Sequence, residues 1–181
     1  MSLPVLKTER LTLRPLTTRD LPAVVRLAGD YEVSKMMSLV PHPYGHEDAV
    51  AWFNQHADQK ENGERAFAID NGEGLIGVIS VGRPVVEPDF GYWLGKPYWG
   101  RGYMTEAGRA VLSWLFEVTP EVTIMSGALT ENPASLNVLG KLGFDGIGPY
   151  RIPVRARGEE LPGTRMKLDR TGFLARLEDA A

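Results

Sequence analysis

The sequence predicts an α/β protein, because stretches with the two-residue period of strands alternate with stretches whose apolar residues recur at helical spacing. Polar and apolar residues alternate over residues 10–14, and the strongest helical stripe lies within residues 102–118. The chain has 181 residues, of which 43% are hydrophobic and 24% are charged. That length and balance are typical of a folded protein with a buried core. We therefore expect a single domain over residues 1–181.

The first half of the chain predicts one strand, two helices and a hairpin. Pro15 closes the first strand, and a helix that starts near Thr18 ends near Gly29. The turn composition Asn-Gly-Glu-Gly joins two short apolar runs into a β-hairpin. Strands are expected at residues 10–14, 65–70 and 75–81, and helices at residues 18–29 and 46–60.

The second half predicts the same alternation, with a strand that is mostly apolar on both faces and is therefore expected at the centre of the sheet. Asn132 and Pro133 are the cap and first residue of a short helix, and Gly143 supplies its left-handed stop. Strands are expected at residues 89–94 and 122–129, helices at residues 102–118 and 132–143, and a closing antiparallel pair at residues 150–154 and 165–168.

The composition excludes several classes of binding site and of catalytic mechanism. A formal net charge of −3 leaves no overall positive field for nucleic acid, and the absence of cysteine removes disulfides, zinc-thiolate sites and cysteine nucleophiles. No apolar run is long enough to span a membrane, so we expect a cytoplasmic protein with neither membrane nor nucleic acid as partner. His42, His46 and His56 lack the spacing of metal ligands, and no metal is expected.

The most informative stretch is the glycine-containing junction between a predicted strand and the strongest helix, residues 99–106 (WGRGYMTE). Two glycines allow a ligand to approach the backbone, and the first amides of a helix lack intrahelical acceptors. Together with the helix dipole, these amides suit an anion such as a pyrophosphate. An isolated Gly-x-Gly is more often only a tight turn, so the wider sequence has to decide between the two interpretations.

Four segments in a fixed order resemble the GNAT superfamily of N-acetyltransferases, and in particular its RimJ/RimL-like branch, over nearly the whole chain. They are residues 8–14 (TERLTLR), 91–94 (GYWL), 99–107 and 132–144. The resemblance implies a mixed, mainly antiparallel, strongly twisted sheet flanked by helices, with acetyl-CoA as the cosubstrate. It also implies a primary amine as the acceptor.

The resemblance assigns the cofactor to the glycine loop and to the middle strand. The family's loop pattern opens with Gln or Arg, has a fixed glycine three residues later and closes with Gly or Ala. Gly102 matches the fixed glycine, whereas Trp99 and Met104 depart from the other two positions. The backbone of the middle strand is expected to bind the pantetheine arm. The cofactor-binding residues implied are Trp93, Leu94, Arg101, Gly102, Tyr103, Met104, Thr105 and Asn132.

Ser135 is the expected general acid. It lies three residues after Asn132, so both side chains project from one face of the first helical turn. In RimL-like enzymes the serine at this position is proposed to protonate the departing thiolate, and the tyrosine that other branches use is absent from residues 132–142. Ser135 could equally serve only to bond local backbone groups. The candidates for a base are weak, namely Asp89 and, second to it, Glu87.

The acceptor is not encoded in a recognisable motif. The RimJ/RimL-like resemblance favours an N-terminal α-amine of a protein or peptide. The alternatives are a small amine, such as an amino acid, polyamine or antibiotic, and a catalytically silent module that binds acyl-CoA. Specificity is expected to come from the early helices and from the loops at residues 41–44 and 83–89. A homodimer is left open.

Overall fold

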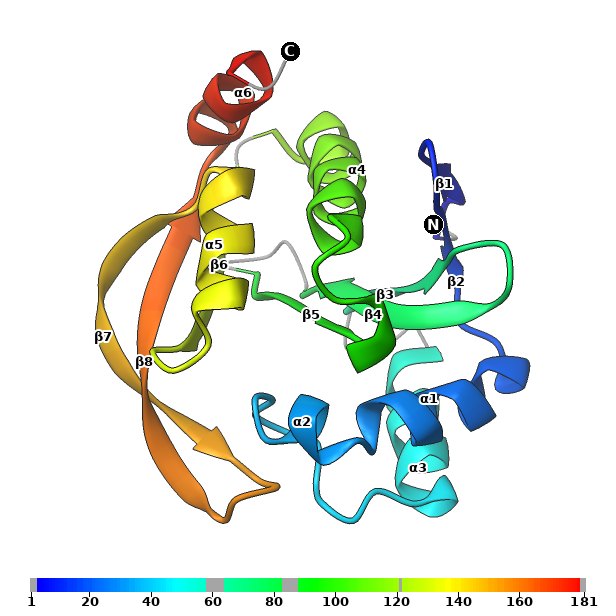
Figure 1. Cartoon of the computed structure of the whole chain (residues 1–181). Coiled ribbons are helices and arrows are strands. Elements are labelled where there is room, and N and C mark those ends of the chain that lie inside the picture. Colours follow the sequence, from blue (N-terminus) through cyan, green and yellow to red (C-terminus); the bar gives the residue numbers. More distant parts are fainter. Residues whose placement is uncertain (1–2, 58–63, 83–87, 121, 180–181) are drawn as a thin grey trace.

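The computed structural model describes residues 3–57, 64–82, 88–120 and 122–179 (Figure 1). Five strands form one antiparallel sheet in the order β1-β2-β3-β4-β5. Every neighbouring pair runs antiparallel, and the predicted hairpin between β3 and β4 is present. The strands are β1 (Leu6–Lys7), β2 (Thr12–Pro15), β3 (Arg65–Asp70), β4 (Leu75–Val81) and β5 (Phe90–Leu94).

A second antiparallel sheet has the order β6-β8-β7. Its strands are β6 (Ile124–Leu129), β7 (Asp145–Val154) and β8 (Glu159–Leu168). The last two form a long hairpin in which residues 150–154 pair with residues 159–163, whereas residues 165–168 pair with the start of β7 and with β6, so the expected pairing of 150–154 with 165–168 is wrong in register. The pairs at the start of β7 involve mostly exposed residues around Gly146 and Ile147, which have no regular apolar alternation to reveal a strand.

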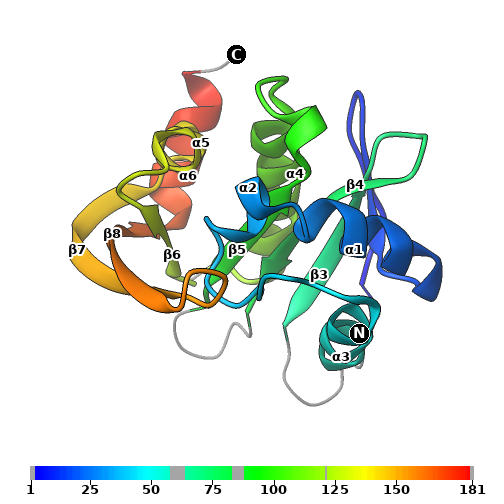
Figure 2. The ribbon, with the colours of Figure 1, turned by 60° about the horizontal axis from the view of Figure 1, so that its bottom comes forward.

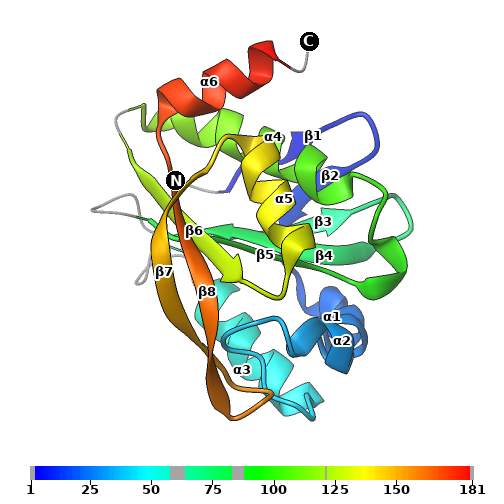
Figure 3. The same cartoon turned by 60° about the vertical axis from the view of Figure 1, so that its left-hand side comes forward.

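The two sheets meet at one short junction between β5 and β6. Asp89 and Met125 form a single parallel bridge, and the Met125 amide donates to the Pro88 carbonyl at 2.9 Å. The buried Ser126 hydroxyl donates to the Phe90 carbonyl at 2.7 Å. Among the described residues this bridge is the whole ladder between the two sheets. Figure 3 shows β5 and β6 running in different directions beyond it.

Helices cover both faces of the first sheet (Figures 1 and 2). Phe67 and Ile69 of β3 pack in the core under α4, whereas Ala66 and Ala68 face α1 and α3. Both faces of these strands are therefore buried, which explains their continuous apolar character. The helices are α1 (Leu21–Ala28), α2 (Tyr31–Ser34), α3 (His46–Ala57), α4 (Tyr103–Val118), α5 (Pro133–Leu142) and α6 (Arg170–Glu178), and the short 3₁₀ turns are η1 (Thr18–Asp20) and η2 (Lys96–Tyr98).

The helices differ from the sequence expectation in length and number. The helix expected over residues 46–60 is described to Ala57, and its last three positions lie outside the described residues. Two further helices were not predicted: α2 spans only four residues, and α6 buries only Phe173, so neither has an apolar stripe. In the part of the chain that the structure describes, none of these helices is long and apolar enough to cross a membrane.

An ion network joins the first strand to the first helical turns. The Arg14 guanidinium donates to both Asp20 oxygens at 2.8 and 2.9 Å, and to Asp70 at 2.9 Å. Asp20 is buried and also accepts from the Thr17 amide at 2.8 Å. Burial alone would raise the pKa of Asp20, but the bonds from Arg14 and Thr17 outweigh it and hold that pKa below its usual value.

Asp20→Asn should therefore lower the free energy of unfolding by about 2 to 3 kcal/mol at pH 7, because it removes the charge of the buried carboxylate and leaves the partly buried Arg14 guanidinium without its main partner. A carboxylate with a lowered folded-state pKa stabilises the fold above its unfolded-state pKa of about 4, and the effect is lost as the pH falls through the folded-state pKa. Urea unfolding between pH 7 and pH 3 should show the gap between wild type and variant narrowing below about pH 4. The exposed Asp145→Asn serves as the control, and a gap that stays constant to pH 3 would contradict the assignment.

Candidate active site

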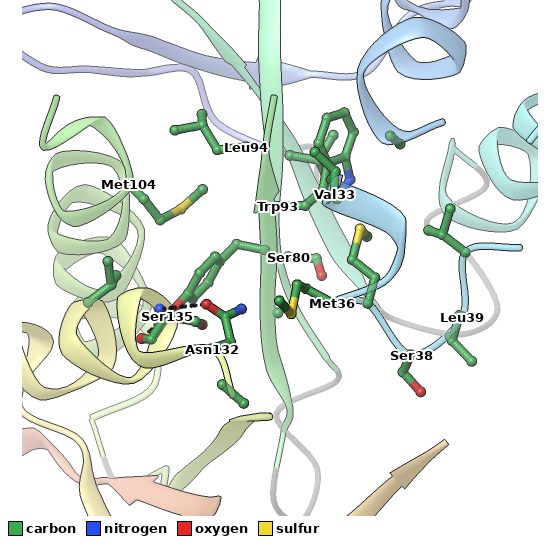
Figure 4. A pocket seen from close by; sticks show the side chains of 18 of the residues that line it. Val33, Met36, Ser38, Leu39, Ser80, Trp93, Leu94, Met104, Asn132 and Ser135 are labelled. Atoms are coloured by element: carbon green, nitrogen blue, oxygen red, sulfur yellow. Dashed lines mark hydrogen bonds between the residues drawn. The ribbon is translucent and has the colours of Figure 1, made fainter. Parts of the chain in front are cut away.

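A cavity of about 1050 Å³ opens where β5 and β6 part. It runs from the N-terminus of α4, past β5 and the start of α5, to α3 and the loop that follows α2. In Figure 4, Met104, Asn132 and Ser135 lie on one side of β5, and Met36, Ser38 and Leu39 lie on the other. The cavity thus has two ends that meet at β5.

The first end is formed by the glycine loop, where two glycines adopt left-handed backbone angles. Gly100 has φ 72° and Gly102, the residue that caps α4, has φ 77°. A side chain built at Gly100 would meet no heavy atom within 4 Å, so the space beside the loop is open. The first amide of α4 bonded to its own turn is that of Glu106, which donates to the Gly102 carbonyl at 3.1 Å. The amides before it have no intrahelical acceptor and suit an anion.

The N-terminal segment holds this loop from behind. The Glu106 carboxylate accepts from the Thr8 hydroxyl at 2.6 Å and from the Arg10 amide and guanidinium at 2.9 and 2.7 Å. The same guanidinium donates to the Arg101 carbonyl at 2.9 Å and stacks over the Tyr103 ring at 4.5 Å. Burial alone would raise the pKa of Glu106, but the bonds from Thr8 and Arg10 outweigh it and lower that pKa. Arg10 therefore neutralises the one acid of this first turn.

Seven of the eight residues predicted to bind the cofactor line this cavity. Arg101 differs, because it is not among the lining residues and its carbonyl is bonded to Arg10. Two polar residues of α5 that the sequence analysis did not select, Asn137 and Lys141, also line the wall. Their spacing of four residues is the signal that would have placed them on one helix face. The predicted residues that line the cavity are Trp93, Leu94, Gly102, Tyr103, Met104, Thr105 and Asn132.

The start of α5 carries the expected serine. Asn132 caps the helix, its side-chain oxygen accepting from the Ser135 amide at 3.2 Å. The Ser135 hydroxyl lies 2.9 Å from the Tyr92 hydroxyl, which also donates to the Ser135 carbonyl at 3.1 Å. Asn132, Ser135 and Tyr92 all line the cavity. The structure therefore brings the predicted pair together and adds a tyrosine from β5.

Tyr92 is a site residue that the sequence analysis missed. Strand alternation places Tyr92 on the same face as Phe90 and Leu94, which is the face that α4 and α5 cover, whereas Trp93 faces α1. That alternation is the signal available in the sequence, but it does not reveal which residue of α5 lies opposite. Burial raises the pKa of Tyr92 to about 12, so its hydroxyl stays protonated at neutral pH.

Asp89, the first of the two predicted bases, does not line the cavity. The Asp89 carboxylate pairs with Arg165 at 2.8 Å, its side chain is 69% exposed, and it is not among the residues that line the cavity. Glu87, the weaker candidate, lies outside the described residues. Of the three histidines only His56 lines the cavity. No group of three or more potential metal ligands occurs in residues 3–57, 64–82, 88–120 and 122–179.

The second end of the cavity is largely apolar and contains acids that already have partners. Its apolar lining comes mainly from the loop after α2, with Met36, Met37, Leu39, Val40 and Pro41. Glu32 pairs with Lys35 at 2.8 Å, and Asp48 accepts from the Gly45 amide at 2.9 Å. Of the loop predicted to set specificity at residues 41–44, Pro41 and Tyr44 line this end. The other such loop, at residues 83–89, lies mostly outside the described residues.

His56 and Glu64 form a pair at the same end. The His56 Nε2 lies 3.2 Å from the Glu64 carboxylate, and its Nδ1 lies 2.6 Å from the Trp52 carbonyl. Burial alone would lower the pKa of His56, but Glu64 and Trp52 outweigh it and raise that pKa. The bond from His56, helped by one from Ser80, lowers the pKa of Glu64 against the effect of burial. The contact thus favours the ionised pair, an imidazolium beside a carboxylate, in which both ring nitrogens of His56 are engaged.

Comparison with known proteins agrees with this geometry. The family description "Acetyltransferase (GNAT) domain" matches residues 10–145. The chain is 25% identical to p20 of Bacillus licheniformis, an N-acetyltransferase without further characterisation, over 84% of this chain and 89% of that one. It is also 25% identical to YdaF of Bacillus subtilis (strain 168), whose name gives ribosomal N-acetyltransferase as a provisional activity, over 83% and 86% of the two chains.

Two solved structures share the fold at low sequence identity. The RimL ribosomal L7/L12 α-N-protein acetyltransferase in complex with coenzyme A superposes with a TM-score of 0.80 at 16% identity, covering 92% of this chain and 98% of that one. The spermidine N-acetyltransferase from Vibrio cholerae in complex with CoA and spermine superposes with a TM-score of 0.77 at 20% identity, covering 92% and 99%. The match over residues 10–145 shows that the chain belongs to the GNAT acetyltransferase family. It is accordingly an acyltransferase enzyme.

Proposed function

We propose that this enzyme transfers the acetyl group of acetyl-CoA to the N-terminal α-amine of a protein or peptide, as a member of the RimJ/RimL-like branch. The observation that carries the proposal is the order of groups along one cavity. Backbone amides at the N-terminus of α4 lie at one end, Ser135 lies at the middle, and an apolar pocket lies at the other end. This order matches the order of the reacting parts, namely pyrophosphate, thioester and amine.

The amides of residues 102–105 and the open space beside Gly100 would hold the pyrophosphate. Lys141 lies on the facing wall and would add a positive charge toward the phosphates. The backbone of β5 at Trp93 and Leu94 lies where β6 has turned away, so its edge is available to the pantetheine arm. The negative charge of the Glu106 carboxylate would not repel the pyrophosphate, because the Arg10 guanidinium pairs with that carboxylate.

Ser135 is the residue proposed to act on the leaving group. Acetyl-CoA supplies a thioester whose acetyl carbon forms a bond to nitrogen while its bond to sulfur breaks. The Ser135 hydroxyl gives its proton to the sulfur, and the proton that the amine releases restores it through water. Asn132 fixes the turn that presents Ser135 to the cavity.

The bonded state of the acids and of His56 in the described part of the cavity supports an α-amine acceptor. Among the described residues that line the cavity, Glu32, Asp48 and Glu64 each have a bonded partner, and His56 has both ring nitrogens engaged. An α-amine with a pKa near 8 is already partly neutral at pH 7.5, whereas a lysine amine near 10.4 is almost fully charged. A site in which these groups are already bonded therefore favours the amine that needs less deprotonation, which is the α-amine. The names of RimL and YdaF agree with this acceptor, whereas the spermidine enzyme represents the small-amine alternative.

Acetyl-CoA at a hundredfold excess over its dissociation constant should stabilise the fold by about 2.7 kcal/mol, a melting shift of roughly 5 to 10 °C. Gly102→Val should remove this shift, because a β-branched side chain is strained at φ 77° and would cover the amides. Gly158→Val is the matched control, since Gly158 has φ 66° but lies in the β7–β8 turn. Both variants should lose stability, and only Gly102→Val should lose the shift. Normal binding by Gly102→Val would show that the loop does not hold the cofactor.

A pair of peptides should test the acceptor. At pH 7.5 a peptide with a free N-terminus and no lysine should be acetylated about 100-fold faster than its N-terminally blocked counterpart with one lysine, because their neutral fractions differ by that order. Release of free thiol and the mass of the product measure both reactions. Equal rates would refute the preference. Turnover of spermidine or an aminoglycoside without turnover of any peptide would establish the small-amine alternative.

Ser135→Ala should lower turnover by about 10- to 100-fold and leave the dissociation constant of acetyl-CoA nearly unchanged, because one proton donor is lost and the binding amides remain. Steady-state rates with the accepted amine and calorimetric titration of the cofactor separate the two effects. Ser113→Ala, on α4 and not among the cavity-lining residues, is the control. Unchanged turnover would reduce Ser135 to a structural role, and a large loss of affinity would make it a binding residue.

A further inference from the structure

The hydroxyl groups of Tyr92 and Ser135 form a pair that crosses from β5 to α5. They lie 2.9 Å apart although the residues are 43 positions apart in the sequence. The Tyr92 ring is held edge-on by Phe90, with ring centroids 5.7 Å apart and planes at 67°. Ser135 in turn is fixed by the Asn132 cap. The backbone positions from which the two hydroxyls project are thus fixed by a paired strand and a capped helix.

The Tyr92 hydroxyl has one hydrogen and two acceptors within reach. The Ser135 carbonyl, at 3.1 Å, can only accept, whereas the Ser135 Oγ at 2.9 Å can accept or donate. When the Ser135 hydrogen is directed to another group, its Oγ becomes the better acceptor, and the Tyr92 hydrogen can turn to it by rotation of the phenol O–H alone. The pair can therefore change its hydrogen-bond direction without moving a heavy atom.

We propose that Tyr92 is a positioning residue for acetyl transfer, whose hydroxyl holds the Ser135 Oγ at the cavity wall and donates to it while the Ser135 proton passes to the departing sulfur. This inference rests on the proposed function of Ser135. Tyr92 keeps its own proton throughout: the sulfur gains the serine proton, and the serine regains the one released by the amine. The stabilisation comes from a hydrogen bond that strengthens as negative charge develops on Oγ.

A phenol suits this task better than an acid would. Because burial raises the pKa of Tyr92 to about 12, the group remains a donor around neutral pH and adds no ionisation to the rate profile there. It also supplies, from β5, a phenol beside α5, whose own residues 133–142 include no tyrosine. Serine alone, with a half-exposed hydroxyl at a helix terminus, would have several rotamers open to it.

The test is a double-mutant cycle with Tyr92→Phe, Ser135→Ala and the double variant, using whichever amine the wild type acetylates. Tyr92→Phe should lower kcat by about 10-fold, with the KM of both substrates within about twofold, because only a donor to the transferring group is lost. In the Ser135→Ala background the same change should have almost no effect, because Tyr92 acts through Ser135. Ser135→Thr, which keeps a hydroxyl, should restore most of the activity and the dependence on Tyr92.

Tyr31→Phe, on α2 and not among the cavity-lining residues, controls for the general loss of a phenol oxygen. The acetyl-CoA melting shift of Tyr92→Phe should match that of the wild type, which shows that the fold and the cofactor end are intact. A Tyr92→Phe enzyme with wild-type kcat, or one that loses equal activity with and without Ser135, would overturn the inference and leave the role of Ser135 standing. A wild type that acetylates no amine would instead remove the proposed function itself.

Discussion

The site depends on one constraint, which is that β5 and β6 are joined at a single point and then separate. The Asp89–Met125 bridge and the bond from Ser126 to the Phe90 carbonyl fix that point. Beyond it, β5 keeps its pairing with β4 on one edge and has an edge without a ladder on the other. An exposed strand edge is ordinarily a liability in a protein. Here it lies in a cavity, where a ligand with amide groups of its own can complete the pairing.

The same separation brings the first turn of α5 against β5. If β6 continued beside β5, its side chains would occupy the space that Ser135 and Tyr92 share. The helix instead meets the strand directly, and the 2.9 Å contact between the two hydroxyls follows from that. The glycine-loop end, the hydroxyl pair and the apolar end are therefore consequences of one opening. The carboxylates that line the cavity are not free to bind a ligand, because each of them is bonded to a partner.

The sequence was informative where a feature depends on local periodicity or local backbone geometry. The regular stripe of α4, the cap and stop of α5 and the β3–β4 hairpin were predicted because their signals lie within a few residues. The glycine loop was found for the same reason. Short or mostly exposed elements, such as α2 and α6, have no such stripe and were missed.

Contacts between distant segments could not be derived in the same way. The position of Tyr92 opposite Ser135 depends on how a strand and a helix cross, and alternation along β5 gives only the face. The pairing of Asp89 with Arg165 likewise depends on how β8 lies relative to the junction. A carboxylate beside a strand end resembles a base in the sequence, and only its neighbours in space reveal that it is already in an ion pair.

The bonds between Arg10 and Glu106 have a consequence for how the enzyme folds and for what proteolysis would do to it. These residues are 96 positions apart, so the first turn of α4 is complete only when the segment around Arg10 has packed against one that is synthesised much later. A protease that cuts shortly after Arg10 would leave most of the core in place, yet it would leave the Glu106 carboxylate uncompensated beside the glycine loop. Cleavage at this one point would thereby change the charge at the glycine-loop end of the cavity while most of the core packing remained.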